Sequence, residues 1–597
     1  MDVSRLAKTT RRAQGRSPIA SEEAIKEDRL LGLPWTRHLV ARHVPLLAVI
    51  LTVALLASPA GAQRHELSTA DRLRMLYTTQ LTFTPEGDPI VRLGLLEGEK
   101  RILFTPNEDF RVLPSGDSGP VIELPGGRQY TVSIADNKPG EYKHWVVVER
   151  LPIDQRERLD EVKKSWLSRG QVPRVFEVGG LFAVRGKVFD SRVILLAVGG
   201  MSSRRKANDL QRKLQARHGI EGGIHSELVE YPTGVIKLEG DGVRAVIRHR
   251  DILQISPMPG REEAIRYKIP GIKKSYTSGT ETRTYTGGLA FAPDKGGELV
   301  VINSLGAERA LKGTVPAEIF ASAPKNALQA QAIAARNEIF SAIGVRNLAD
   351  PYMLRADIYD QVYGGVGAED RRTSAAVDAT RGKVMFYGNQ IVEAFFSSNA
   401  GGFTENNENV WDMEPRPYLR GRPDAPREKV PGPFRDGITE KELDRFLDEG
   451  FDAFSKIAPV SSSKLFRWNK SVKASVPQRW LEDAGHKVGR IKDINIKSRG
   501  VSGRVIQLEI IGERGKALVE RELNVRRLFG GLRSGLFTMD IRRDGRGFIS
   551  DIAFKGAGFG HGVGMCQTGA VGMASKGHSA EDILGHYYKG ITVKDLY

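Results

Sequence analysis

The sequence has a single cysteine, Cys566, among 597 residues. One thiol cannot form an intramolecular disulfide, and it also excludes a cysteine-rich zinc site or an iron–sulfur cluster. Repeats of fixed period and low-complexity tracts are absent as well. Because no helix-turn-helix, zinc-finger or RNP-like signature occurs, we expect no nucleic acid partner.

Long hydrophobic runs are also scarce, and the one that stands out is residues 45–57, PLLAVILTVALLA. A run of this length is short for a transmembrane helix, which needs about 20 residues. Basic side chains precede the run, and Ala60 and Ala62 follow it at the spacing of a signal-peptidase site. We therefore predict a signal peptide within 1–62 and export to the periplasm or cell wall. The polar lead of about 44 residues leaves open a downstream start codon, or an uncleaved anchor as the one contact with a membrane.

The composition is that of a globular protein with a strongly basic balance. Hydrophobic residues make up 40% and charged residues 27%, and the net charge is +17. The length suggests roughly three or four domains. A basic surface favours anionic partners such as the carboxylates of peptidoglycan, although a solvated basic face gives the same charge.

The first half of the chain divides into short segments. Over 63–152, β-like runs alternate with turn residues, which predicts a small β-rich module. Residues 153–192 are expected to form a linker and strands. The segment VILLAVGGMSSRRKANDLQRKLQARHGI (193–220) follows as strand, turn and helix. It resembles a SPOR domain, a family that binds glycan strands stripped of stem peptides, and we place this module at 193–258; any βα unit gives the same pattern.

The second half shows longer elements. Residues 285–305 alternate about an Asp-Lys-Gly-Gly turn and predict a β-hairpin. An alanine-rich helix is expected over 326–342, after Pro324. A loop rich in Pro, Arg and Gly covers 413–440. A helix near 440–457 and strands within 489–512 complete the pattern.

Four segments, in order, resemble the SpoIID/LytB family of sporulation lytic transglycosylases and amidase enhancers. They are ALKGTVPAEIFASAPKNALQAQAIAARNEIF (310–340), DQVYGGV (360–366), ATRGKVMFYGNQIVEAFFSSNAGGFTENNENVW (379–411) and GFGHGVGMCQTGAVGMASKGHSAEDILGHYYKGI (558–591). The resemblance covers roughly 285–597 and implies an α+β domain there. With the small β-rich and βα modules before it, the expected fold class is multi-domain α+β.

The resemblance places the catalytic acid at Glu318, in the VPAEI segment before the alanine-rich helix. Breaking a glycosidic bond needs an acid for the leaving oxygen, and a glutamic acid serves near neutral pH only if burial or neighbouring groups raise its pKa. Val315, Ile319 and Phe320 can supply an apolar wall. The alternative is an exposed glutamate that begins a helix, where the macrodipole favours it.

Further residues match other positions of these motifs, and each has a structural alternative. Arg336 can orient a substrate or form an ion pair, and Tyr363 can stack on a sugar or pack in the core. The polar loop before Trp411 can approach a ligand or form a plain turn. The expected substrate-binding residues are Gln331, Arg336, Tyr363, Ser398, Asn399, Thr404, Glu405, His561 and Gln567.

The sequence also departs from the family pattern. Some members carry His and Cys able to bind zinc in the polar loop, where this chain has Ser397 and Ala400, so we expect no metal and no cofactor. His561 with His578 or His586 fits no standard metal spacing. Asn337-Glu338 replaces a usual Thr-Tyr, and Cys566 replaces a common Ser and is expected to be buried.

The resemblance therefore implies an exported peptidoglycan lytic transglycosylase. It would cut glycan strands, already stripped of peptides, between N-acetylmuramic acid and N-acetylglucosamine, with Glu318 as the single acid/base and 1,6-anhydro ends as products. The alternative is a non-catalytic glycan-binding protein that stimulates a cell-wall amidase. A third possibility is a structural protein whose basic face adheres to the wall.

Overall fold

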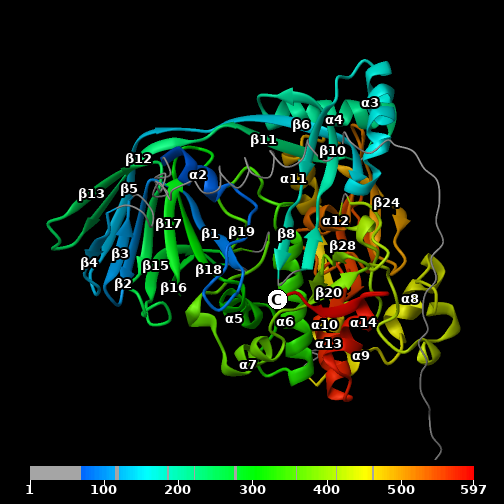
Figure 1. Ribbon diagram of the computed structural model, residues 1–597. Helices are drawn as coiled ribbons and strands as arrows, with labels where there is room; N and C mark the ends of the chain where they lie inside the picture. The colour runs from blue at the N-terminus through cyan, green and yellow to red at the C-terminus, as the bar shows by residue number, and fades with distance from the viewer. Residues whose placement is uncertain are drawn as a thin grey trace, which may run out of the picture. The chain divides into compact units, whose positions relative to one another are not determined.

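The described part of the chain is an α+β structure, which confirms the expected fold class (Figure 1). The computed structural model describes residues 69–114, 120–184, 187–220, 222–274, 278–357, 360–411, 413–459 and 463–597. The predicted signal peptide lies outside these residues. None of the helices in the described ranges combines the length and the apolar character needed to cross a membrane.

Two sheets pack face to face to form a sandwich. Alternating side chains meet between them, and the ring of Phe104 lies 5.7 Å from that of Phe291 in the opposite sheet. One sheet has the order β19 (Leu354–Arg355), β1 (Ile90–Glu99), β18 (Leu299–Gly306), β17 (Gly288–Pro293), β14 (Leu253–Pro257), β3 (Phe110–Leu113) and β4 (Ile122–Leu124). The other has the order β13 (Val246–Arg250), β12 (Thr233–Gly240), β5 (Tyr130–Lys138), β2 (Arg101–Pro106), β15 (Tyr267–Lys273) and β16 (Thr280–Tyr285).

The sandwich joins parts of the sequence that we expected in separate modules. The predicted hairpin over 285–305 is confirmed as β17 and β18, but β18 pairs with β1, with Leu93 opposite Asn303. Helix α2 (Thr69–Leu76) covers the outer face of this sheet, where Leu73 and Leu76 belong to one apolar cluster with Val300. The β-rich module of 63–152 and the beginning of the 285–597 segment thus share one core.

A second module is inserted between β5 and β12. Its elements follow a βαββαβ sequence, and its four strands form an antiparallel sheet in the order β11, β6, β10, β7, which is the split βαβ arrangement. Helices α3 and α4 contribute Trp166 and Leu214 to its core. The elements are β6 (Glu141–Pro152), η2 (Ile153–Arg158), α3 (Leu159–Ser168), β7 (Arg174–Val178), the hairpin β8 (Leu181–Val184) and β9 (Lys187–Asp190), β10 (Val193–Met201), α4 (Arg204–His218) and β11 (Ile224–Glu230).

The inserted module differs in extent from the βα unit expected over 193–258. Strand β10 and helix α4 lie where the pattern places them, and Ser203 caps α4 by accepting a hydrogen bond from the Lys206 amide. The next two strands, β12 and β13, belong to the six-stranded sheet instead. The difference arises because strand pairing, and not order in the chain, decides which sheet a strand joins.

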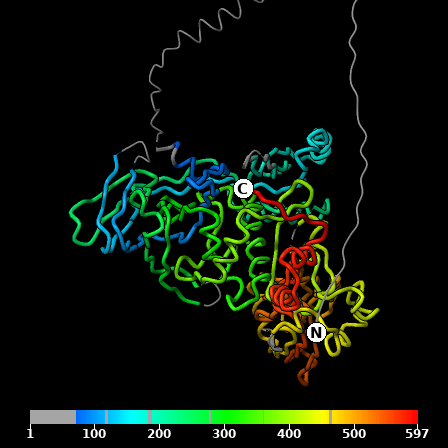
Figure 2. Tube along the Cα trace, turned by 60° about the horizontal axis from the view of Figure 1, so that its bottom comes forward, coloured from blue at the N-terminus to red at the C-terminus, as the bar shows by residue number. Residues whose placement is uncertain are grey.

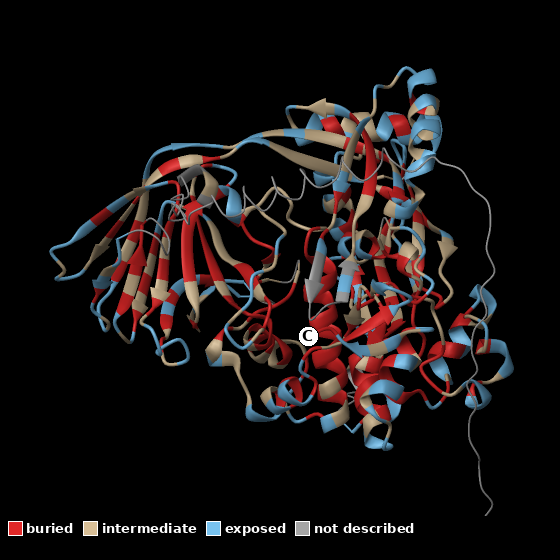
Figure 3. Cartoon of the chain, in the orientation of Figure 1, coloured by how far each residue is buried: buried red, intermediate tan, exposed pale blue. Residues whose placement is uncertain are grey.

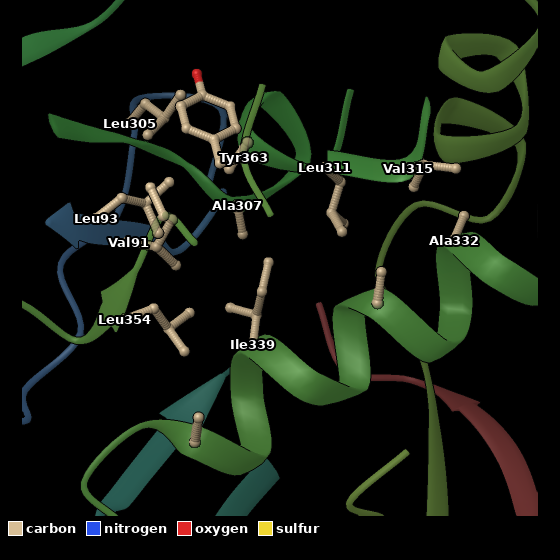
Figure 4. Packing of buried hydrophobic residues seen from close by; sticks show 14 of the residues in the cluster. Val91, Leu93, Leu305, Ala307, Leu311, Val315, Ala332, Ile339, Leu354 and Tyr363 are labelled. Carbon is tan, nitrogen blue, oxygen red and sulfur yellow. The ribbon is translucent and has the colours of Figure 1, made fainter. Parts of the chain in front are cut away.

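Helix α6 (Lys325–Ala342) confirms the predicted alanine-rich helix and is buried along most of its length (Figure 3). Its small side chains let neighbouring elements approach closely on several sides. Figure 4 shows Ile339 of α6 beneath Ala307 and Leu311 of α5 (Ala307–Glu318) and close to Val91 of β1. The two helices therefore continue the core of the sandwich.

The rest of the chain packs around α6, and its last strand pairs with a strand that follows α6 in the sequence. Strand β30 (Thr592–Asp595) pairs with β20 (Lys383–Tyr387), so the red end of the chain in Figure 2 meets its middle part. The predicted strands within 489–512 are confirmed as β24 (Ile491–Arg499) and β25 (Val505–Gly512). The other elements are η3 (Val366–Ala368), α7 (Arg371–Ala379), β21 (Gln390–Ile391), β22 (Phe396–Ser397), η4 (Asn407–Asn409), η5 (Arg427–Lys429), η6 (Gly432–Phe434), α8 (Glu440–Asp448), α9 (Phe454–Ile457), α10 (Ser463–Phe466), β23 (Arg467–Lys473), α11 (Ser475–Asp483), β26 (Lys516–Glu520), α12 (Glu522–Leu528), β27 (Phe537–Arg543), β28 (Ile549–Ala557), β29 (Met565–Cys566), α13 (Gln567–Ser575) and α14 (Ala580–Tyr587).

Candidate active site

Glu318 is the last residue of α5, and the chain becomes extended at Ile319 before it enters α6. Its main chain is held by Gln567, whose Nε2 donates to the Glu318 carbonyl at 2.9 Å and to Oε1 of Gln331 at 3.2 Å. The alternative of a glutamate that begins a helix does not describe this position. At the C-terminal end of a helix the macrodipole disfavours a carboxylate.

The Glu318 side chain lines a cavity of about 790 Å³. The lining residues come from α5, α6 and several loops that are far apart in the sequence. Charged residues of the lining include Glu338, Asp360, Glu393 and Arg346, and its aromatic residues include Phe395, Trp411 and His561.

The pKa of Glu318 is raised from its ordinary value of 4.5 to about 7. Burial of the carboxyl group is the main cause, and the nearby Glu338 adds to it, while a hydrogen bond from the backbone of Val362 acts in the opposite direction. The Glu318 carboxyl group is thus protonated in a substantial fraction of the molecules at neutral pH. That is the state a general acid needs.

One side of the cavity is aromatic. The rings of Phe395 and Trp411 are stacked with centroids 4.4 Å apart and planes inclined by 27°. The ring of His561 lies 4.7 Å from that of Trp411. Aromatic faces of this kind offer an apolar surface to the C–H groups of a sugar ring.

His561 is a neutral ring at this wall. Its Nδ1 accepts a hydrogen bond from the Val563 amide at 3.0 Å, and the backbone of Phe396 supplies a second partner. Burial and the nearby Arg526 and Arg504 lower its pKa to about 3. The structure thus brings His561 and Glu318 to one cavity, with the imidazole in its uncharged form.

Two expected substrate-binding residues, Gln331 and Gln567, lie behind Glu318 and not on the cavity lining. Gln331 is fully buried, and its own Nε2 has no hydrogen-bond partner among the described residues. The geometry makes these two side chains positioning groups for the Glu318 turn.

Arg336 and Tyr363 occupy the positions of their structural alternatives. Two guanidinium nitrogens of Arg336, Nε and Nη2, each donate to one oxygen of the Glu308 carboxylate at 2.7 Å, in a pair that is almost completely buried. Tyr597 also donates its hydroxyl to Glu308. The Tyr363 ring packs in the core near Leu305 and Ala307 (Figure 4), where a Cβ at Gly313 would lie 2.7 Å from it.

The polar loop at 398–405 is mostly engaged in holding the chain together. The Glu405 carboxylate accepts hydrogen bonds from the amides of Asn406, Val501 and Ser502 and from the Ser502 hydroxyl. Backbone or side-chain hydrogen bonds also tie Thr404, Ser398 and Asn399 to neighbouring segments. None of these three residues lines the cavity, and neither does Glu405. The loop thus stabilises the segment that carries Trp411 at the aromatic side of the cavity.

The described residues contain no group of three or more His, Cys, Asp or Glu side chains placed to hold a metal ion. His578 and His586 instead pack their rings on Phe454. The buried Cys566 caps α13, since its Sγ accepts from the Ala400 and Gly569 amides at 3.2 Å. Burial raises the pKa of this thiol above its ordinary value.

Several cavity residues were missed in the sequence. Glu338 was noted only as a departure from the family, and Trp411 only as the end of the polar loop. Asp360 and Glu393 lie within two of the family-like segments and Arg346 lies outside all four, but nothing local marks any of them as a neighbour of Glu318. They converge because α6 and the two loops beside it are packed together.

Two family models match the chain. The stage II sporulation protein family (SpoIID) matches residues 295–387, a stretch that contains α5, α6 and therefore Glu318. A domain of unknown function (DUF8618) matches residues 405–564. The SpoIID match contains Glu318 and Glu338 of the cavity lining, and the second match contains Trp411 and His561.

Curated proteins are similar over about half of the chain or more. Stage II sporulation protein D of Bacillus subtilis is 26% identical over 313 residues, 49% of this chain and 76% of that protein. The amidase enhancer of Bacillus subtilis is 28% identical over 297 residues, 47% of this chain but only 40% of that protein. An uncharacterized protein of Brachyspira hyodysenteriae is 27% identical over 377 residues, 63% of this chain and 89% of that protein.

Proposed function

Because the chain carries a domain of the SpoIID family, we propose that it is an exported lytic transglycosylase that remodels peptidoglycan. It cuts glycan strands between N-acetylmuramic acid and N-acetylglucosamine. The observation that carries this proposal is Glu318, a carboxyl group with a pKa of about 7 in a cavity with an aromatic wall. The aromatic wall supports a sugar substrate, and the pKa supports acid catalysis near neutral pH.

Glu318 acts in both steps of the reaction. The protonated carboxyl group gives its proton to the glycosidic oxygen, and the bond from that oxygen to C1 of N-acetylmuramic acid breaks. The C6 hydroxyl of the same sugar then bonds to C1 and returns its proton to the Glu318 carboxylate. No water is consumed, and the product is a 1,6-anhydro end. Acid–base assistance of this kind contributes roughly 10²–10⁴-fold to the rate.

The other parts of the chain suit work in the cell wall. The predicted signal peptide directs the protein out of the cytoplasm, to the periplasm or the wall. Its net charge of +17 favours the anionic wall. The inserted βαββαβ module is the part we propose to hold stripped glycan strands, although the split βαβ fold serves many functions and does not by itself assign one.

The second candidate is a non-catalytic enhancer of a cell-wall amidase. It is favoured by the similarity to the amidase enhancer of Bacillus subtilis. In that case the cavity binds glycan, and an amidase partner cuts the amide bond that joins the stem peptide to the glycan strand. Glu318 would then serve in binding only.

The test uses purified protein with intact and amidase-treated peptidoglycan, and mass spectrometry of the products. We expect 1,6-anhydro ends from the wild type and none from Glu318→Gln. Glu428→Gln, at an exposed glutamate in η5, is the matched control and should cleave normally. The rate should fall as the pH rises above about 7, because the acid form of Glu318 is lost.

Two results would change the assignment. Anhydro ends from both wild type and Glu318→Gln would keep the reaction and remove Glu318 as its acid. Absence of cleavage by the wild type, together with retained glycan binding, would support the amidase enhancer.

A further inference from the structure

Glu338 brings a second carboxyl group to the cavity, and one of its oxygens is unused. The residue is 7% exposed and lines the same cavity as Glu318. Its Oε1 has no hydrogen-bond partner among the described residues. Leaving a buried polar atom unpaired is unfavourable, so such an atom at a cavity is a candidate ligand contact.

Glu338 accepts a hydrogen bond from the Ala394 backbone and pairs with Arg346 through Oε2, and the neighbouring carboxylates also have donors. Glu393 accepts from Arg416 Nε at 3.0 Å. Asp360 Oδ2 accepts from Asn347 Nδ2 at 2.7 Å and from the Arg355 amide at 2.8 Å. Arg346 lies between them, 3.5 Å from Oε2 of Glu338 and 3.6 Å from Oδ1 of Asp360. Within the described residues, Oε1 of Glu338 is thus a buried carboxylate oxygen at the cavity that accepts no hydrogen bond.

The cavity is acidic, although the protein as a whole is strongly basic. Its lining contains five acidic side chains and two arginines, while the complete chain carries a net charge of +17. The imidazole of His561 adds no positive charge. An acidic lining of this kind favours a ligand with N–H donors or a positive charge.

We propose that the Glu338 end of the cavity is a subsite for the C2 nitrogen of a hexosamine, whose N–H donates to Glu338 Oε1. The excess of carboxylates makes a free ammonium, as in an N-deacetylated sugar, the preferred form over an acetamide. The aromatic pair of Phe395 and Trp411 takes the C–H face of the same ring. This inference rests on the proposed function to the extent that the cavity binds glycan, but it does not require cleavage.

The test measures binding by isothermal titration calorimetry with two probes, the tetramer of glucosamine and the tetramer of N-acetylglucosamine. We expect the wild type to bind the glucosamine tetramer more tightly. Glu338→Gln keeps an acceptor oxygen but removes the charge, so it should weaken the glucosamine tetramer about 10- to 100-fold and the acetylated tetramer much less. Glu338→Ala removes the acceptor and should weaken both.

Glu428→Gln is the control, because it removes one charge at an exposed site that does not line the cavity. We expect its affinity for either tetramer to change less than threefold. Equal losses in Glu338→Gln and Glu428→Gln would overturn the subsite, as would unchanged binding in Glu338→Gln. Tighter binding of the acetylated tetramer by the wild type would overturn the ammonium preference.

Thermal melting checks that each variant folds. If Glu338→Gln does not fold, Glu338→Asp keeps the charge and withdraws the oxygen, and it should also lose affinity for the glucosamine tetramer. If binding follows these expectations but the protein makes no anhydro ends, the proposed catalysis is wrong and this subsite stands. Cleavage without any dependence of binding on Glu338 would do the reverse.

Discussion

Glu318 should destabilise the folded protein whenever it is ionised, and replacing it should reveal by how much. Its pKa is raised from 4.5 to about 7 on folding, so the folded state binds more protons than the unfolded state between these values. Stability therefore falls as the pH rises through this window. Below about pH 4.5 both states are protonated and the penalty vanishes.

The size of the penalty follows from the pKa shift. Each pKa unit corresponds to about 1.4 kcal/mol, so the full shift gives an upper bound of about 3 kcal/mol at pH 8. Since Glu318 is only partly buried by surface exposure, solvent screening reduces this figure, and we expect about 1–3 kcal/mol. Glutamine has the shape of the protonated acid and carries no charge, so Glu318→Gln should be more stable than the wild type by this amount at pH 8.

The assay is urea unfolding of wild type and Glu318→Gln at pH 4.5 and pH 8, followed by tryptophan fluorescence. The two proteins should be similar at pH 4.5 and should separate at pH 8. Comparing variants at each pH cancels the titration of all other groups, and Glu428→Gln controls for the loss of one charge at an exposed site. A stability difference that is the same at both pH values, or a less stable Glu318→Gln at pH 8, would refute the reasoning.

Two further predictions concern the core and the wall of the cavity. Arg336→Met leaves the buried Glu308 carboxylate without its cation, so it should lower the free energy of unfolding by about 3–5 kcal/mol in urea titrations. The double variant Glu308→Leu/Arg336→Met should recover part of the loss. Full stability in the single variant would mean that the pair is dispensable. Trp411→Ala removes the stacked ring from the wall and should weaken glycan binding about tenfold in calorimetry with little change in secondary structure by circular dichroism; unchanged binding would remove the aromatic wall from the site.

Local patterns predicted the elements well where a single segment decides its own structure. The alanine-rich run after Pro324 became α6, and the Asp-Lys-Gly-Gly turn became the β17–β18 hairpin. The pairing of β18 with β1 could not be seen, because the two strands are about 200 residues apart and no local signal specifies the partner. The strand and helix at 193–220 were predicted, but the extent of the inserted module was not, for the same reason.

The site shows the same division. The Glu318 and His561 motifs pointed to two residues that do line one cavity. Gln331, Arg336 and Glu405 belong to the same motifs, yet their hydrogen bonds hold α5, α6 and the polar loop in place. A polar residue in a motif can serve the scaffold as well as the ligand, and only its burial and partners distinguish the two. Glu338 carried a signal, its departure from the family pattern, that became interpretable once its neighbours were known.

The insertion between β5 and β12 has a consequence for how the chain folds. Thr233 pairs with Lys138, and closing a flexible loop of this length costs about 4 kcal/mol of entropy. Within the module, β11 pairs with β6, and Glu230 lies opposite Glu141, only a few residues from the Thr233–Lys138 pair. If the module folds early, it holds the two ends together, and β12 can dock on β5 as in a short hairpin. The inserted module then holds β5 and β12 close together and so sets the order in which the sandwich forms.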